Sequence, residues 1–336
     1  VTALINVLHS LVFFLAKNQK NKFINLSFSQ NQEDYFWRLV ATHYLHNIKG
    51  TVWSIRAMKF ILQRLGIRSA IMIAGGERTL HTVLGCKLAG IPTVGIQHGA
   101  SPRYCLVSDF MPEFDGENSL SLNRYGLWSE WWREYYLKYS RVFKPEQLYV
   151  SGSPRPLERE DGLLEPLASK SGSIRVLFVS EQEAEPKEVM PYLLTLLDVK
   201  DFTVSLKFRP QTDGFEEWLK KNESDILERV KTLKGDIHKA VSESDVVVGS
   251  YSTGVLEGFV QLKPVIFFRT GKWGDYYDIK SFDVQGRFFA ENPKELINCI
   301  KRSVDVPKED LKQLQERFLG NPYQNGSKWA VEQALE

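Results

Sequence analysis

The chain has 336 residues, which is long for one compact core and suits two domains of about 150 residues each. A hydrophobic share of 43% and a charged share of 25% are ordinary for a globular protein, and a net charge of +2 excludes general polyanion binding, so no nucleic-acid partner is expected. The cysteines Cys86, Cys105 and Cys299 are too scattered for a disulfide framework or a metal site, which favours a reducing compartment.

The sequence contains no uninterrupted apolar stretch of the roughly 18 residues that a membrane span needs. The apolar stretch over residues 1–16 is interrupted by His9 and Ser10, and no basic stretch precedes it, so a signal peptide is not expected. These features predict a cytoplasmic protein.

Strand-like and helix-like segments alternate along the first half of the chain. Residues 22–28 read as extended and residues 33–65 mostly as helix, broken near Gly50. The pattern then predicts strands over 69–74, 92–97, 124–128 and 148–151, and helices over 79–89 and 129–140.

A polar segment rich in Pro, Gly and charges, residues 156–173, predicts a linker, after which the alternation restarts. Strands are expected over 174–180, 202–208, 245–249 and 264–268, and helices over 186–197, 214–221, 225–243, 253–262, 293–303 and from 309 onward. Continuous apolar strands alternating with helices are typical of parallel sheets covered on both faces. The expected fold class is therefore α/β, with two doubly wound Rossmann-like domains facing a cleft.

The domain limits follow from the same pattern. We expect an N-terminal Rossmann-like domain over 1–155 and a C-terminal Rossmann-like domain over 156–308. Residues 309–336 form a C-terminal helical segment that is long enough to cross back to the first domain. Because ligands of such sheets bind beyond the carboxyl ends of the strands, the loops there are where chemistry is expected.

The stretch DVVVGSYSTGVLEGFVQLKPVIFF reads as strand, turn, helix and strand. Ser250, Ser252, Thr253 and Gly254 enter the helix, where hydroxyls and free backbone N–H groups make an anion site. Glu257, one turn on, is positioned to accept hydrogen bonds from ribose hydroxyls. The alternative is that the serines and the threonine only cap the helix.

Two further strand ends point to the same edge of the second sheet. Ser180 ends one strand, and Arg209 follows another, where its guanidinium is able to neutralise a phosphate bidentately. The alternative for Arg209 is a surface arginine in a turn.

In the first half, two strand ends carry candidate catalytic groups. Glu77 and His98 follow strands that are expected to be neighbours, and a carboxylate and an imidazole on one rim are candidate general bases. Gly99 permits close backbone approach, while Arg103 and Arg155 supply positive charge in the same half. The alternative for His98 is a turn histidine bonded to the backbone. No acidic pair lies at a strand end and no Walker loop is present, so neither a metal nor a cofactor is expected.

Three segments carry a resemblance to a known family: LGCKLAGIPTVGIQHGA, LYVSGSPRP and SDVVVGSYSTGVLEGFVQLKPVIFF. They resemble GT-B glycosyltransferases of bacterial surface and capsular polysaccharide synthesis. The resemblance implies a transferase that moves a sugar from a nucleotide-sugar, bound by the C-terminal domain, to a glycan or lipid-linked acceptor on the side of the N-terminal domain. Gly99, Arg103 and Arg155 would then be acceptor-side residues. Because no acidic pair lies at a strand end, the transfer is expected to be metal-independent. It also implies work at the inner face of the membrane, with a peripheral membrane contact left open.

Related families share parts of these motifs. The His98-Gly99 turn of this chain resembles the His-Gly turn of teichoic-acid polymerases that use CDP-polyols. CMP-sugar transferases for Kdo or sialic acid carry a Lys-Pro-His-Pro-like turn. The corresponding segment here, KFRPQ over 207–211, has no histidine, which departs from the CMP-sugar pattern. The other hypotheses are a sugar-nucleotide epimerase, a CDP-polyol phosphotransferase of the teichoic-acid class and a catalytically silent binding domain.

Overall fold

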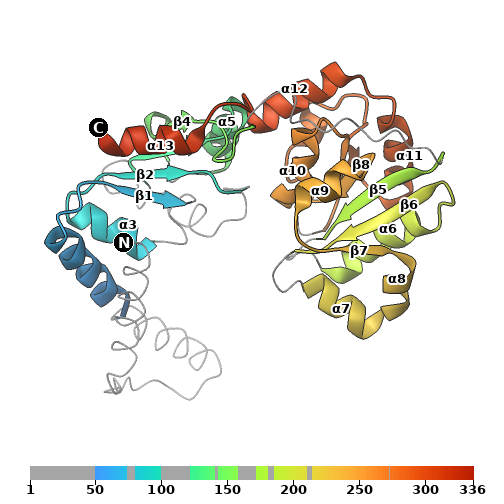
Figure 1. Ribbon diagram of the computed structural model, residues 1–336, viewed down its shortest axis with the longest axis horizontal. Coiled ribbons are helices and arrows are strands. Elements are labelled where there is room, and N and C mark those ends of the chain that lie inside the picture. Colours follow the sequence, from blue (N-terminus) through green and yellow to red (C-terminus); the bar gives the residue numbers. More distant parts are fainter. Residues whose placement is uncertain are drawn as a thin grey trace, which may run out of the picture.

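The computed structural model describes residues 50–73, 80–99, 122–140, 143–157, 172–180, 185–209, 214–271 and 273–336. Each half of the chain builds one parallel sheet flanked by helices (Figure 1). The α/β class with two parallel sheets is therefore confirmed. The extended segment expected over 22–28 lies outside the described residues, while residues 50–64 are helical as expected.

The first sheet has four described strands in the order β1-β2-β3-β4, all parallel. The strands are β1 (Ala70–Ile73), β2 (Thr93–Ile96), β3 (Arg124–Leu127) and β4 (Leu148–Val150). Helix α3 (Leu80–Leu88) lies between β1 and β2 in the chain, and α5 (Glu130–Tyr139) lies between β3 and β4. The pairing of β1 with β2 confirms that the two strands expected to be neighbours are neighbours.

The second sheet has six described strands in the order β10-β9-β8-β5-β6-β7, again all parallel. The strands are β5 (Ile174–Val179), β6 (Phe202–Lys207), β7 (Lys231–Leu233), β8 (Val246–Gly249), β9 (Val265–Phe268) and β10 (Phe289–Ala290). The helices are α6 (Pro186–Leu197), α7 (Gly214–Asn222), α8 (Ser224–Arg229), α9 (Ile237–Ser242), α10 (Thr253–Val260) and α11 (Pro293–Ser303).

The central strands of this sheet are buried because they are apolar on both faces. All residues of β8 and of β9 are buried, as expected of a parallel sheet sandwiched between helices. The strand order also fixes the place of a ligand site. The chain adds strands outward from β5 to β7, then returns to β8 beside β5 and adds strands toward the opposite edge. The strand order therefore reverses between β5 and β8, which is the topological switch point of the sheet.

The prediction of a helix over residues 225–243 is wrong in the middle of this stretch. The structure divides this stretch into α8, the edge strand β7 and α9. Strand β7 has two exposed residues and one half-buried residue, so it shows no apolar run that the sequence could reveal. Its backbone pairs with β6, which supplies the stability that the side chains do not.

The C-terminal segment joins the two halves. Helix α12 (Lys308–Leu319) packs on α10, where Gln315 donates from Nε2 to Phe259 O at 2.9 Å. Helix α13 (Gly326–Leu335) packs on β1, β2 and β3 of the first sheet (Figure 1). The domain limits at 155 and 308 stay a prediction, since the structure gives elements and contacts rather than independent folding units.

Helix α5 of the first half is tied to the second half at several points. Trp132 donates from Nε1 to Phe318 O at 2.7 Å, and Lys138 pairs with Asp278 at 2.7 Å. The Tyr135 hydroxyl donates to the carbonyl of Tyr276. These contacts hold helix α5 against the second half of the chain and against the end of α12.

The turn between α12 and α13 requires glycine at position 320. Gly320 has φ 67° and ψ −147°, and a Cβ there would lie 2.3 Å from Trp128 O. We expect Gly320→Ala to lower the free energy of unfolding by more than the about 1–3 kcal/mol of backbone strain, because the clash adds to it. Urea denaturation measures the loss.

Gly286→Ala is the matched control. Gly286 also has a positive φ of 59°, but no heavy atom lies within 4 Å of an added Cβ. Gly286→Ala should lower the free energy of unfolding only through backbone strain, and therefore by less than Gly320→Ala. Equal losses in the two variants would contradict a steric role of Trp128.

Candidate functional site

The switch point of the second sheet brings two of the expected binding residues together. Ser180 follows β5 and Ser250 follows β8, and these strands are paired in register from Val176 with Val246 onward. Ser180 is 1% exposed and Ser250 is 4% exposed. The backbone N–H of Ser180 donates to Lys207 O at 2.9 Å, which fixes this strand end. Their binding roles stay predictions.

Helix α10 begins directly above this strand end. The Ser252 side chain caps it by accepting from Gly254 N at 3.2 Å, so the capping interpretation of Ser252 is confirmed. A hydroxyl that accepts through one lone pair can still donate its own hydrogen to a ligand. A Cβ on Gly254 would lie 3.8 Å from Val179 Cγ1, so the helix start stands against the end of β5.

Glu257 lies one turn into α10 and its side chain is 32% exposed. Its carboxylate is 3.5 Å from His238 Nδ1 on α9. Burial raises the pKa of Glu257, while the charges of His238 and Arg155 act in the opposite direction. The cost of burying this carboxylate is therefore only partly offset by cations, which suits a group that accepts hydrogen bonds from a ligand.

On the first half, His98 is exposed two residues after the end of β2. The buried Gln97 holds this turn from both sides. Its Oε1 accepts from Trp128 N at 3.0 Å, and its Nε2 donates to Gly99 O at 3.2 Å. Trp128 also donates from Nε1 to Gln97 O at 2.9 Å. The imidazole therefore projects from a turn whose backbone is fixed.

The two halves meet at α10. A Cβ on Gly99 would lie 3.5 Å from Thr253 Oγ1, so the turn after β2 abuts the helix start. Gly99 does not have a positive φ, so close approach to Thr253, and not an unusual backbone conformation, is what the structure offers for a glycine there. Arg155 is exposed and acts electrostatically on Glu257, which brings it to the expected nucleotide side and not only to the acceptor side.

Arg209 is exposed two residues beyond β6, on the same edge as Ser180 and Ser250. We expect Arg209→Lys to weaken nucleotide binding by about tenfold, because the charge remains but the bidentate fork is lost. Calorimetric titration with a nucleoside diphosphate measures this.

Arg229→Lys serves as control, since Arg229 is an exposed arginine at the end of α8 that pairs with Asp198 at 3.2 Å. Unchanged affinity in Arg209→Lys would identify Arg209 as an ordinary surface arginine.

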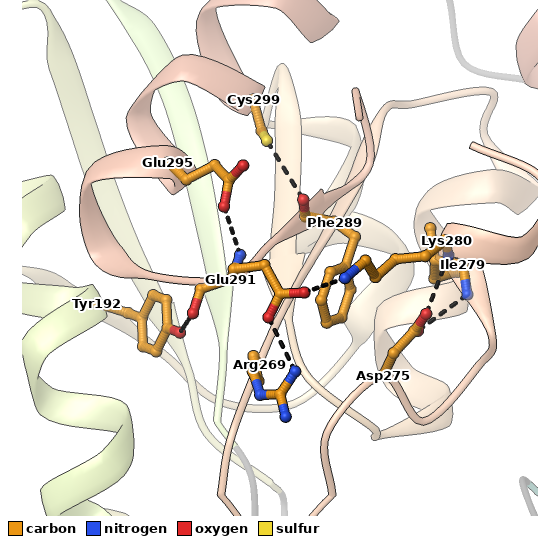
Figure 2. A network of polar contacts seen from close by, with 9 residues as sticks. All are labelled: Tyr192, Arg269, Asp275, Ile279, Lys280, Phe289, Glu291, Glu295 and Cys299. Carbon is orange, nitrogen blue, oxygen red and sulfur yellow. Dashed lines mark hydrogen bonds and ion pairs between the residues drawn. The ribbon is translucent and has the colours of Figure 1, made fainter. Parts of the chain in front are cut away.

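The sequence interpretation missed Arg269, which directly follows β9. Figure 2 shows the Glu291 carboxylate between Arg269, at 3.0 Å, and Lys280. These cations, Lys280 first, lower the pKa of Glu291. Glu295 accepts from Glu291 N at 2.9 Å in the same cluster. These contacts hold the loop after β9 in place. In the sequence, only the arginine that follows PVIFF indicated a charged group at this strand end.

Two candidates, Glu77 and Arg103, lie outside the described residues, so their roles stay predictions. Among the described residues, no group of three or more His, Cys, Asp or Glu side chains could hold a metal ion.

Comparisons with known proteins bear on the fold. No family model matches the chain, and no curated protein matches its sequence. It is similar to the solved UDP-GlcNAc 2-epimerase of Methanocaldococcus jannaschii in complex with UDP-GlcNAc and UDP, with a TM-score of 0.56 and 12% identity over 85% of this chain and 81% of that one.

Two further solved structures are similar over 97% of this chain and 88% of theirs. One is the Neisseria meningitidis UDP-GlcNAc 2-epimerase bound to UDP-GlcNAc, with a TM-score of 0.53 and 14% identity. The other is a glycosyltransferase from Rickettsia africae, with a TM-score of 0.51 and 12% identity. At these identities the likeness shows the fold, which is the GT-B-like arrangement of two Rossmann-like domains.

Proposed function

We propose that this protein is an enzyme that acts on a nucleotide-activated sugar. The observation that carries the proposal is the start of α10, which stands over the β5–β8 switch point while the His98–Gly99 turn of the other half abuts it. A helix N-terminus favours phosphate, and a switch point is where doubly wound sheets bind ligands. The sugar would then lie between the helix start and His98.

Epimerisation of the bound sugar is the reaction that the comparisons favour. Two of the three similar structures described above are UDP-GlcNAc 2-epimerases, and both hold UDP-GlcNAc. UDP-GlcNAc is therefore the first substrate to test. An epimerase of this kind would interconvert two sugar-nucleotides with no net release of nucleotide.

Transfer to an acceptor is the second candidate, and the exposed His98 favours it. A neutral imidazole at the rim is able to take the proton of an acceptor hydroxyl as that oxygen bonds to the sugar. The bond from the sugar to the diphosphate breaks in the same step, and N–H groups of α10 with nearby cations stabilise the departing nucleotide. The similar Rickettsia africae protein is a glycosyltransferase.

One experiment tests both candidates. The purified protein is incubated with UDP-, GDP-, CMP- and CDP-activated donors, with and without lysate-derived glycan acceptors, and the products are separated by chromatography. Interconversion of sugar-nucleotides without nucleotide release supports the epimerase. Acceptor-dependent release of nucleotide supports the transferase. Failure to bind or convert any donor contradicts the proposed function.

A further inference from the structure

The helix over residues 50–64, here called the basic helix, has one buried and one exposed face. Its inward positions are Ser54, Ile55, Met58 and Leu62, each no more than 9% exposed. Helix α3 covers this side so closely that a Cβ on Gly85 would lie 2.8 Å from Met58 Cγ. The basic helix is therefore anchored to the first half by its inner face, and the side chains of its outer face are exposed.

Large apolar side chains lie on that outer face. Phe60 is 68% exposed and Trp53, two turns earlier on the same face, is 46% exposed. Val52 and Leu65 flank them at 41% and 49%. Neither Trp53 nor Phe60 has a ring partner among the described residues. Leaving such apolar area in water is unfavourable, so this face is suited to an external apolar contact.

The same segment carries an uncompensated positive charge. Residues 50–68 contain Arg56, Lys59, Arg64 and Arg68 and no Asp or Glu. None of these four cations forms an ion pair with any part of the chain that the structure describes. Arg56 and Arg64 lie on the face of Trp53 and Phe60, because these positions follow helical spacing. Four positive charges within 19 residues contrast with a net charge of +2 for the whole chain.

The basic helix lies far from the switch point. In Figure 1 it is the blue helix at the outer end of the first half, beyond α3 and on the side away from the second sheet. Changes on its outer face should therefore leave nucleotide binding at α10 unaffected.

We propose that the outer face of the basic helix binds the surface of an anionic lipid bilayer. Trp53 and Phe60 enter the interface between headgroups and acyl chains, and the cations around them contact lipid phosphates. Each Lys or Arg close to an anionic surface strengthens binding, and an interfacial tryptophan suits the boundary between apolar and polar layers. No helix within the described ranges is both long and apolar enough to cross a bilayer, so the contact is a peripheral one.

This inference does not depend on the proposed reaction, and it is tested without substrate. The full chain is sedimented with vesicles of pure phosphatidylcholine and with vesicles of one part phosphatidylglycerol to two parts phosphatidylcholine. We expect binding to the anionic vesicles only, and we expect it to fall as ionic strength rises.

Two variants separate the contributions of charge and apolar area. R56E/R64E should weaken binding to anionic vesicles by at least about tenfold, and W53S/F60S should do the same through lost apolar contact. K294E/K301E is the matched control, because Lys294 and Lys301 are two exposed lysines on α11, in the other half. Circular dichroism and thermal unfolding establish that every variant is folded.

The proposal is supported if both basic-helix variants lose vesicle binding while K294E/K301E keeps it. It is overturned if the native chain binds neither vesicle, which would leave an acidic protein as the partner of this face. It is equally overturned if K294E/K301E loses as much vesicle binding as R56E/R64E. Binding would then depend on the overall positive charge of the chain and not on the basic helix.

Discussion

Replacing His98 by alanine is expected to lower turnover by about 10²–10⁴-fold, the usual contribution of a general acid or base. His98 is exposed on a turn that Gln97 and Trp128 fix, and the adjacent Gly99 abuts Thr253 at the start of α10. A neutral imidazole has a nitrogen lone pair that can accept the proton of a reacting hydroxyl. Steady-state assays with the donor that the conversion experiment selects measure the effect.

Nucleotide affinity separates this role from a structural one. His98→Ala should leave the dissociation constant of the nucleotide nearly unchanged, because the nucleotide is assigned to the second half. Glu77→Gln is the companion variant, since Glu77 is the competing base. If Glu77→Gln alone abolishes turnover and His98→Ala retains it, the roles are reversed. If neither affects turnover, the rim of the first half is not the catalytic edge.

The sequence predicts those parts of the fold that depend on local apolar pattern. Strands β8 and β9 are continuous apolar runs whose residues are all buried in the structure. The first-turn polar residues of α10 likewise predict the observed cap at Ser252. These features depend only on residues that are close together in the chain, and for that reason a single sequence reveals them.

Elements that depend on pairing with distant strands are missed. Strand β7 presents two exposed residues and one half-buried residue, and β10 has two residues, too few for any periodic pattern. Both are held at the sheet edges by backbone pairing, β7 with β6 and β10 with β9. Propensity cannot predict them, because the stabilising hydrogen bonds come from the neighbour and not from the segment itself.

The candidate site shows the same division. Ser180 and Ser250 are predictable as strand ends, and the observed pairing of β5 with β8 brings them to one edge. The approach of Arg155 to Glu257, and of Gly99 to Thr253, depends on how the two halves sit against each other. No local pattern contains that information. This explains why Arg155 was expected only on the acceptor side.

Replacing Glu257 by glutamine is expected to weaken nucleotide binding by about 10- to 100-fold, which corresponds to about 1.5–3 kcal/mol for a hydrogen bond to a charged group. Glutamine keeps the size of the side chain but removes the charge that makes the carboxylate a strong acceptor for ribose hydroxyls. Glu316→Gln is the matched control, because it removes the same charge from an exposed position on α12. Titration calorimetry with the nucleotide measures both variants.

The pH dependence of binding gives a second and independent readout of Glu257. Because burial raises its pKa above the usual 4.5, the carboxylate takes up a proton at a higher pH than an ordinary glutamate does. The protonated form is a weaker acceptor, so affinity for a ribose hydroxyl should fall as the pH is lowered through this raised pKa. The fall should be present in the native chain and in Glu316→Gln, and absent in Glu257→Gln. If Glu257→Gln binds nucleotide as tightly as the native chain and keeps the same pH dependence, the ribose contact lies elsewhere. The pairing of Glu257 with His238 would then be structural.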